Sequence, residues 1–94
     1  MPYGIFRFTV EDYAKWKPVY DEHTAARKVS GSKGAQVLQN AENPNEIMII
    51  LEYESVEKAK AFSQSEGLRL AMQKAGVNSI PDIIFVNEVE RTDG

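Results

Sequence analysis

The chain contains the stretch Glu46-Ile47-Met48-Ile49-Ile50-Leu51-Glu52, an apolar run bounded by two glutamates. It predicts a β-strand, because the run is short and rich in isoleucine. Successive side chains of a strand point to opposite faces of a sheet, so this strand would place apolar side chains on both faces. Ile83-Ile84-Phe85-Val86 predicts a final strand of the same kind. The sequence therefore predicts a sheet that has to be covered on both sides.

Two further strands are expected nearer the N-terminus. Ile5–Val10 predicts a strand, because its aromatic and aliphatic residues alternate with polar ones. Gly34–Asn40 predicts the next strand, and the stretch Asn40–Asn45 is rich in residues that favour turns. A hairpin therefore joins this strand to the extended segment Glu46–Glu54.

A broken helix is expected between the first two strands, within Asp12–Val29. Asp12 or Thr9 can cap its start with a side-chain oxygen. Pro18 lacks the N–H group that a helix interior needs, so we expect a kink there and a second segment that opens near Pro18. Gly31 is expected to end the helix.

A second broken helix is expected between the hairpin and the final strand. Ser55 predicts its start, Ser65 predicts a restart, and Gly76 predicts its end. The apolar faces of the two segments are formed by Val56, Ala59 and Phe62, and by Leu68, Ala71, Met72 and Ala75. Glu90–Gly94 is expected to be a frayed tail.

The element order predicts the fold class. Strand, helix, strand, strand, helix, strand is the ferredoxin-like βαββαβ arrangement, an α+β fold in which an antiparallel four-stranded sheet carries both helices on one face. No stretch resembles a linker, so residues 1–94 are expected to form one domain.

The same reasoning predicts a homodimer. Two helices cover one face of the sheet, which leaves either Met48 and Ile50 or their neighbours on the open face, and such a patch is rarely left exposed by a soluble monomer. A second copy that packs sheet against sheet about a two-fold axis would bury it. The alternative is a monomer in which loops or the tail cover the patch. Four polar residues are expected at the rim or across the interface: Arg7, Gln36, Glu52 and Glu54.

The amino-acid composition limits the kinds of partner that the protein is expected to bind. The 94 residues carry a formal charge of −3 and give an isoelectric point near 5.1, which argues against a nucleic-acid partner. The chain has no cysteine and a single histidine, so neither disulfides nor a metal site is expected. Met1–Phe8 lacks the features of an export signal and no later run is long enough to span a membrane, so a cytoplasmic location with no membrane partner is expected.

A candidate site lies on the first helix. Tyr13, Trp16, Tyr20, His23 and Arg27 follow the spacing of neighbours on one helix face. Histidine is a common general base, so His23 is the candidate base, and an arginine can hold an oxyanion or a carboxylate, which is the role expected of Arg27. The three aromatic residues would bind a small hydrophobic or aromatic molecule. The alternative is that the stripe is an ordinary helix-to-sheet core.

The chain also resembles a known family. The resemblance rests on short phrases, namely Asp12-Tyr13-Ala14-Lys15-Trp16-Lys17-Pro18, Asp21-Glu22-His23, Arg27, Gly31-Ser32, Asn43-Pro44-Asn45-Glu46, and Glu57-Lys58-Ala59 before Phe62. They look like small proteins of the dimeric α/β-barrel superfamily, near the antibiotic biosynthesis monooxygenases. The resemblance implies a homodimer whose two sheets form a barrel, with a small-molecule cleft between each sheet and its helices. Members of that superfamily include cofactor-free oxygenases, haem degraders and cyclases.

Departures from the active members restrict the function. Haem-degrading relatives use an asparagine on the first strand, a tryptophan on the third and a histidine on the second helix, whereas this chain has Phe6 or Phe8, then Tyr53, and no such histidine. Polyketide cyclases place a working histidine late in the chain, where this sequence has none. The resemblance therefore leaves three alternatives open, none of which needs a cofactor: a monooxygenase-like or cyclase-like enzyme with His23 as base, a non-catalytic binding module, and a dimerisation module.

Overall fold

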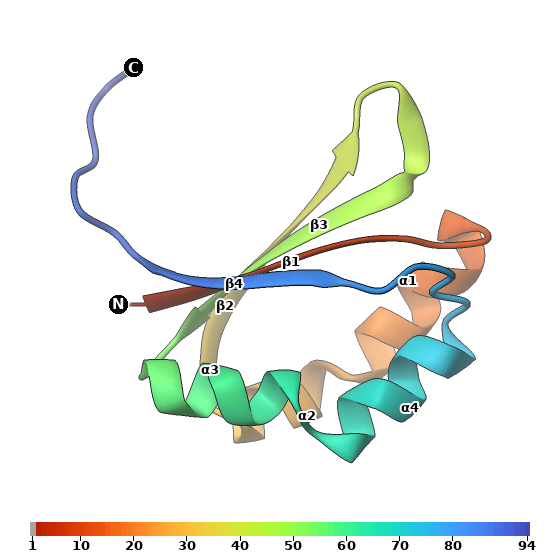
Figure 1. The fold of residues 1–94 in the computed structure, drawn as a ribbon, viewed down its shortest axis with the longest axis horizontal. Helices are drawn as coiled ribbons and strands as arrows, with labels where there is room; N and C mark the ends of the chain where they lie inside the picture. Colours follow the sequence, from red (N-terminus) through yellow and green to blue (C-terminus); the bar gives the residue numbers. More distant parts are fainter. Residues whose placement is uncertain (1) are drawn as a thin grey trace.

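The strands form one antiparallel sheet with the order β2-β3-β1-β4, and the helices lie on one face of it (Figure 1). This is the ferredoxin-like α+β fold that the element order predicts. The computed structural model describes residues 2–94. The elements are β1 (Pro2–Thr9), α1 (Tyr13–Glu22), α2 (Thr24–Val29), β2 (Ser32–Asn40), β3 (Asn43–Tyr53), α3 (Val56–Ser63), α4 (Glu66–Lys74) and β4 (Asp82–Asn87). Within residues 2–94, no helix is long and apolar enough to cross a bilayer.

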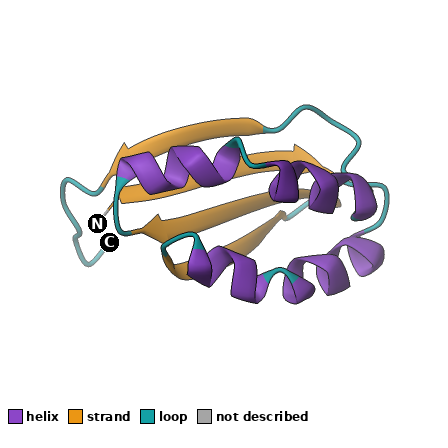
Figure 2. Ribbon diagram, turned by 90° about the horizontal axis from the view of Figure 1, so that it is seen from below, coloured by secondary structure: helices purple, strands orange, loops and turns teal. Residues whose placement is uncertain are grey.

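The hydrophobic core lies between the sheet and the helices. Phe6 at the centre of β1 is opposite Ile49 on β3 and Ile83 on β4. Figure 2 shows the helices in two rows over this face, α1 with α2 and α3 with α4. The buried apolar residues are Phe6, Phe8, Val10, Trp16, Ile47, Ile49, Leu51, Tyr53, Ala59, Phe62 and Ala75. The alternation predicted for the first strand is confirmed, because Phe6 and Phe8 are buried while Arg7 is exposed.

The first helix breaks at His23, and the prediction of a break at Pro18 is wrong. Pro18 lies inside α1, and Ala14, whose carbonyl loses its helical donor to the proline, is exposed to solvent. At the observed break the Tyr20 carbonyl accepts from Arg27 Nη1 at 2.7 Å, and the Asp21 carbonyl accepts from the Thr24 hydroxyl at 2.7 Å. Side chains thus take over carbonyls that a continuous helix would use, and the chain turns there.

The predicted helix ends are confirmed. The Asp12 side chain accepts from the Ala14 N–H, and Ser55 and Ser65 cap α3 and α4 in the same way. Gly31 and Gly76 follow the helices with φ of 107° and 79°, a conformation that glycine adopts without strain.

The hairpin is tighter than the sequence indicates. The turn between β2 and β3 consists of Ala41 and Glu42, and β3 already begins at Asn43. The Asn40 side chain accepts from the Glu42 N–H at 2.8 Å, which closes the turn early. The first strand is also shifted: it runs from Pro2 to Thr9, and Val10 forms an isolated bridge with Val77.

The other face of the sheet carries no helix (Figure 1). Ile5 on β1 is opposite Ile50 on β3 and Ile84 on β4, so three isoleucines form a row across the face. Leu38 and Met48 form a neighbouring pair on β2 and β3. The open face is defined here by the outward side chains of Tyr3, Ile5, Leu38, Met48, Ile50, Ile84 and Val86. The sheet is therefore apolar on both sides, as the run at Ile47–Leu51 predicts.

Glu54 directly follows the last residue of β3, and its predicted place at a dimer rim stays a prediction. It forms ion pairs with Lys33, at 2.8 Å, and with Lys58. Hydrogen bonds from Lys33 and then Lys58 lower the pKa of Glu54 from 4.5 to about 2. One lysine from β2 and one from α3 thus keep this carboxylate ionised.

This pKa gives an acid-stability prediction. Because the folded-state pKa of Glu54 is lower than the unfolded value, the ionised carboxylate stabilises the fold above pH 4.5, and that contribution is lost as the pH falls from 4.5 to about 2. In Glu54→Gln we expect Tm to fall less steeply with acidification over this range. The effect should be small, since both lysines are exposed. Thermal unfolding as a function of pH measures it, and Glu90→Gln in the exposed tail is the control.

Candidate functional site

A cavity of about 50 Å³ lies between the sheet and the two rows of helices. Its walls are mainly apolar. Aromatic rings come from Phe6, Phe8, Trp16, Tyr20 and Phe62, and smaller apolar side chains from Val19, Ile49, Leu51, Leu68, Ala71, Met72 and Ala75. His23 and Arg27 are its two basic residues. An apolar cavity with a few polar groups is the usual form of a small-molecule site.

A stack of side chains forms the α1 and α2 side of the cavity. The Trp16 ring lies 5.0 Å from the Tyr20 ring, with the planes 26° apart. The Arg27 guanidinium lies 3.7 Å from the centre of the Tyr20 ring. Tyr13 packs against Trp16 from outside at 5.8 Å, and it does not line the cavity. The stack continues across the break in the helix, because α2 turns back and places Arg27 over Tyr20.

Arg27 is buried, with 8% of its surface exposed, although it is charged. Its Nη1 donates to the Tyr20 carbonyl at 2.7 Å and its Nη2 donates to the Thr24 hydroxyl at 3.2 Å. A buried cation needs such partners. Arg27 therefore ties α2 to the end of α1, and two of its five N–H donors are used in doing so.

His23 occupies the break between α1 and α2. Its backbone N–H donates to the Tyr20 carbonyl at 3.2 Å, and its ring makes no capping hydrogen bond to α2. The half-buried side chain lines the cavity and also two surface openings next to it. Within residues 2–94, no group of three or more His, Cys, Asp or Glu side chains is arranged to hold a metal ion.

Tyr53 ties the end of α2 to the sheet. Its ring is fully buried, and its hydroxyl lies 3.2 Å from the Ser30 hydroxyl, which donates to the Arg27 carbonyl at 2.6 Å. Burial raises the pKa of Tyr53 above 10, opposed by the hydrogen bond to Ser30 and the charge of Arg27. The phenol therefore remains neutral and fixes the position of α2.

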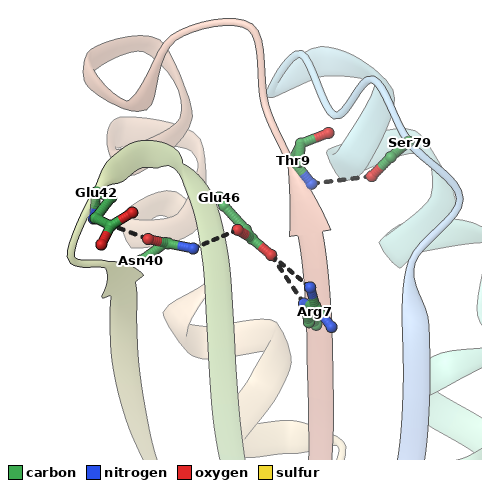
Figure 3. A network of polar contacts seen from close by, with 6 residues as sticks. All are labelled: Arg7, Thr9, Asn40, Glu42, Glu46 and Ser79. Carbon is green, nitrogen blue, oxygen red and sulfur yellow. Dashed lines mark hydrogen bonds and ion pairs between the residues drawn. The ribbon is translucent and has the colours of Figure 1, made fainter.

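A network of polar side chains borders the open face near the turn that joins β2 to β3 (Figure 3). Arg7 forms an ion pair with Glu46 at 2.8 Å, and the Asn40 amide donates to the other oxygen of Glu46 at 2.6 Å. Hydrogen bonds from Arg7 and then Asn40 lower the pKa of Glu46. At the end of β1, the Thr9 N–H donates to the Ser79 hydroxyl at 2.9 Å. The charges of Arg7 and Glu46 are thus paired with each other within one chain.

Of the five predicted site residues, four line the cavity: Trp16, Tyr20, His23 and Arg27. Their roles in binding or catalysis stay predictions. Four further wall residues come from α3 and α4, namely Phe62, Leu68, Ala71 and Met72. The sequence places them on apolar helix faces but gives no sign of a cavity, because a wall residue and a core residue follow the same helical spacing.

The fold and the cavity define a ferredoxin-like α+β protein with a space between its sheet and its helices. A family model described as antibiotic biosynthesis monooxygenase matches residues 7–74, so the chain belongs to this family. A comparison with curated proteins finds no match.

Solved structures of low sequence identity share the fold. A candidate antibiotic biosynthesis monooxygenase from Bordetella bronchiseptica is 15% identical with a TM-score of 0.81, over 95% of this chain and 97% of that one. SnoaB, a cofactor-independent oxygenase from Streptomyces nogalater, is 13% identical with a TM-score of 0.79, over 99% and 97%. Rv0793 from Mycobacterium tuberculosis is 11% identical with a TM-score of 0.70, over 99% and 100%. At these identities the likeness shows the fold alone.

Proposed function

We propose that this protein binds a small hydrophobic or aromatic molecule in the cleft between sheet and helices, and oxidises it with molecular oxygen, using His23 as the base and no cofactor. The observation that carries the proposal is the position of His23, half-buried at the edge of a cavity lined by five aromatic rings. Membership of the antibiotic biosynthesis monooxygenase family supports it. So does the description of SnoaB, a protein of the same fold, as a cofactor-independent oxygenase.

The proposed reaction is the oxidation of an activated methylene group, as in an anthrone. The imidazole of His23 takes a proton from the carbon, and the neighbouring rings delocalise the carbanion. The carbanion gives its electrons to O₂, forming a carbon–oxygen bond and a peroxide, which takes the proton back from the imidazolium. Loss of water then leaves a ketone, so that CH₂ and O₂ become C=O and H₂O. In this scheme the unused donors of Arg27 hold the developing oxyanion.

A non-catalytic binding module is the second candidate. It is favoured by the contacts of Arg27, whose guanidinium already stacks on Tyr20 and bonds to the Tyr20 carbonyl and to Thr24. In that case the cleft captures a ligand without turnover. A cyclase-like enzyme would instead consume its substrate without taking up oxygen.

We also propose that the protein forms a homodimer and that it acts in the cytoplasm. The open face supports the dimer, because a row of three isoleucines crosses it and the helices leave it uncovered. Packing two such faces about a two-fold axis matches each patch with a copy of itself. Cell fractionation tests the location, and the test of the dimer is given in the Discussion.

Turnover of 1,8-dihydroxyanthrone tests the catalytic proposal. Oxygen uptake and quinone absorbance are measured in air, and the rate without protein is subtracted. We expect His23→Ala to lower the rate at least about a hundredfold, the lower end of what a general base contributes, with unchanged anaerobic binding of the anthrone.

Lys28→Ala is the matched control, because it removes an exposed side chain from α2, the helix that directly follows His23. A His23→Ala rate equal to that of the wild type would refute the role of His23 as base. Binding without oxygen uptake by the wild type would favour the non-catalytic module.

A further inference from the structure

Two openings at the surface adjoin the cavity, and His23 lines both of them. One opening lies between α1 and α4 and is bordered by Glu22 and Lys74. The other is a groove between α2 and the α3–α4 connection. The groove shares three wall residues with the cavity, namely His23, Phe62 and Leu68. The two spaces are therefore neighbours, separated by the side chains of Phe62 and Leu68.

The volumes of the two spaces differ. The cavity has about 50 Å³, enough for a few water molecules at roughly 10–15 Å³ each. The groove has about 550 Å³ and the α1–α4 opening about 330 Å³, so both are within the range of about 300–1,000 Å³ that is usual for small-molecule sites and the groove is the larger. A molecule of several rings therefore fits the groove, while the cavity takes a single small group.

The walls of the two openings also differ in chemistry. Across the α1–α4 opening, Lys74 Nζ lies 3.1 Å from Glu22 Oε2, and this ion pair connects the two helices. The groove is lined mainly by apolar side chains, including those of Ala26 and Ala61. Val29 at its edge is 88% exposed, so its apolar side chain is available to contact a bound molecule. The α1–α4 opening also has apolar walls at Val19, Leu70 and Ala71, and the groove has one lysine, Lys58, so the difference is the Glu22–Lys74 ion pair that an apolar molecule would meet in the α1–α4 opening.

We propose that the groove between α2 and α3–α4 holds the outer rings of a polycyclic aromatic ligand whose reacting end lies at His23. The proposal rests on the proposed function, since it concerns the same ligand. It assigns the larger part of the binding site to the surface of Ala26, Val29, Ala61 and Phe62, and it makes this groove the way in. The opening between α1 and α4 then takes no part in binding.

Variants that fill one opening at a time test this assignment. Ala61→Trp fills the groove, Leu70→Trp fills the α1–α4 opening, and neither residue lines the cavity. Ala14→Trp is the matched control, because it introduces the same side chain at an exposed position of α1. Anaerobic calorimetry measures the binding of phenol, with one ring, and of 1,8-dihydroxyanthrone, with three. Circular dichroism checks that each variant is folded, and Ala26→Trp fills the groove from its opposite wall if Ala61→Trp does not fold.

We expect the wild type to bind the anthrone at least about tenfold more tightly than phenol. The groove variant should lose at least about tenfold in affinity for the anthrone and keep its affinity for phenol, while Leu70→Trp and Ala14→Trp bind like the wild type. If Leu70→Trp is the variant that loses affinity, or if filling the groove changes nothing, the inference is overturned and the proposed function stands. A wild type that binds neither probe overturns both.

Discussion

Replacing Ile50 with glutamate is expected to turn the proposed dimer into monomers. Ile50 lies on β3 in the row of isoleucines, opposite Ile5 on β1 and Gln36 on β2. At a two-fold interface the substitution places two carboxylates, one from each copy, in an apolar contact. Removing a charge from water without a partner costs several kcal/mol, so we expect the dissociation constant to rise at least about a thousandfold.

The ion pair between Arg7 and Glu46 makes this expectation sharper. Arg7 is already paired within its own chain, so it is not free to neutralise the new carboxylate. The neighbours of Arg7 across the sheet are Met48 and Asp82. Asp82 adds a negative charge to that of Glu46 at the same end of the face. The row of Ile50 itself holds Gln36, Ile5 and Ile84, so it offers the introduced glutamate no cation.

Sedimentation velocity over a range of protein concentrations measures the effect. Ile80→Glu is the matched control, because it makes the same change at a side chain that is 93% exposed and lies outside the sheet. We expect the control to sediment as the wild type does. A wild-type protein that is monomeric at micromolar concentration, or an Ile50→Glu variant that remains dimeric, would contradict the proposed sheet-to-sheet dimer.

The sequence predicts the fold well because each strand carries its own pattern. The alternation in β1 and the double-sided apolar run in β3 determine which side chains face the helices, and the buried positions Phe6, Ile47 and Ile49 agree with both. Serines before α3 and α4 and glycines after α2 and α4 are local signals whose effect does not depend on distant residues. These predictions are confirmed.

The break in the first helix could not be predicted from such local signals. Pro18 is the stronger breaker by type, yet α1 runs through it. The observed break depends on Arg27, which reaches back seven residues to the Tyr20 carbonyl, an interaction that becomes apparent only when α2 is in place. The candidate site has the same limitation. The stripe from Trp16 to Arg27 is visible in the sequence, but the opposite wall at Phe62 and Leu68 belongs to helices whose position depends on the whole fold.

Replacing Trp16 with alanine is expected to give the largest loss of stability among single substitutions in the stripe. Trp16 is 3% exposed, and its ring contacts those of Phe8, at 5.8 Å, and Tyr20, at 5.0 Å. Truncating a buried tryptophan costs about 3–5 kcal/mol of unfolding free energy, a large part of the total for a domain of this size. The loss should also loosen Arg27, because the guanidinium lies on the Tyr20 ring that Trp16 supports.

Urea unfolding followed by circular dichroism measures the change, since the substitution removes the only tryptophan. Trp16→Phe keeps an aromatic ring against Tyr20 and should lose much less, while Val29→Ala at an 88% exposed position should lose almost nothing. A loss below about 1 kcal/mol in Trp16→Ala would mean that the ring supports little of the fold. Because Trp16 is both part of the core and a wall of the cavity, Trp16→Phe also separates its two roles: a variant of near-normal stability that binds the anthrone more weakly identifies a ligand contact, and one that binds it equally well identifies a core residue.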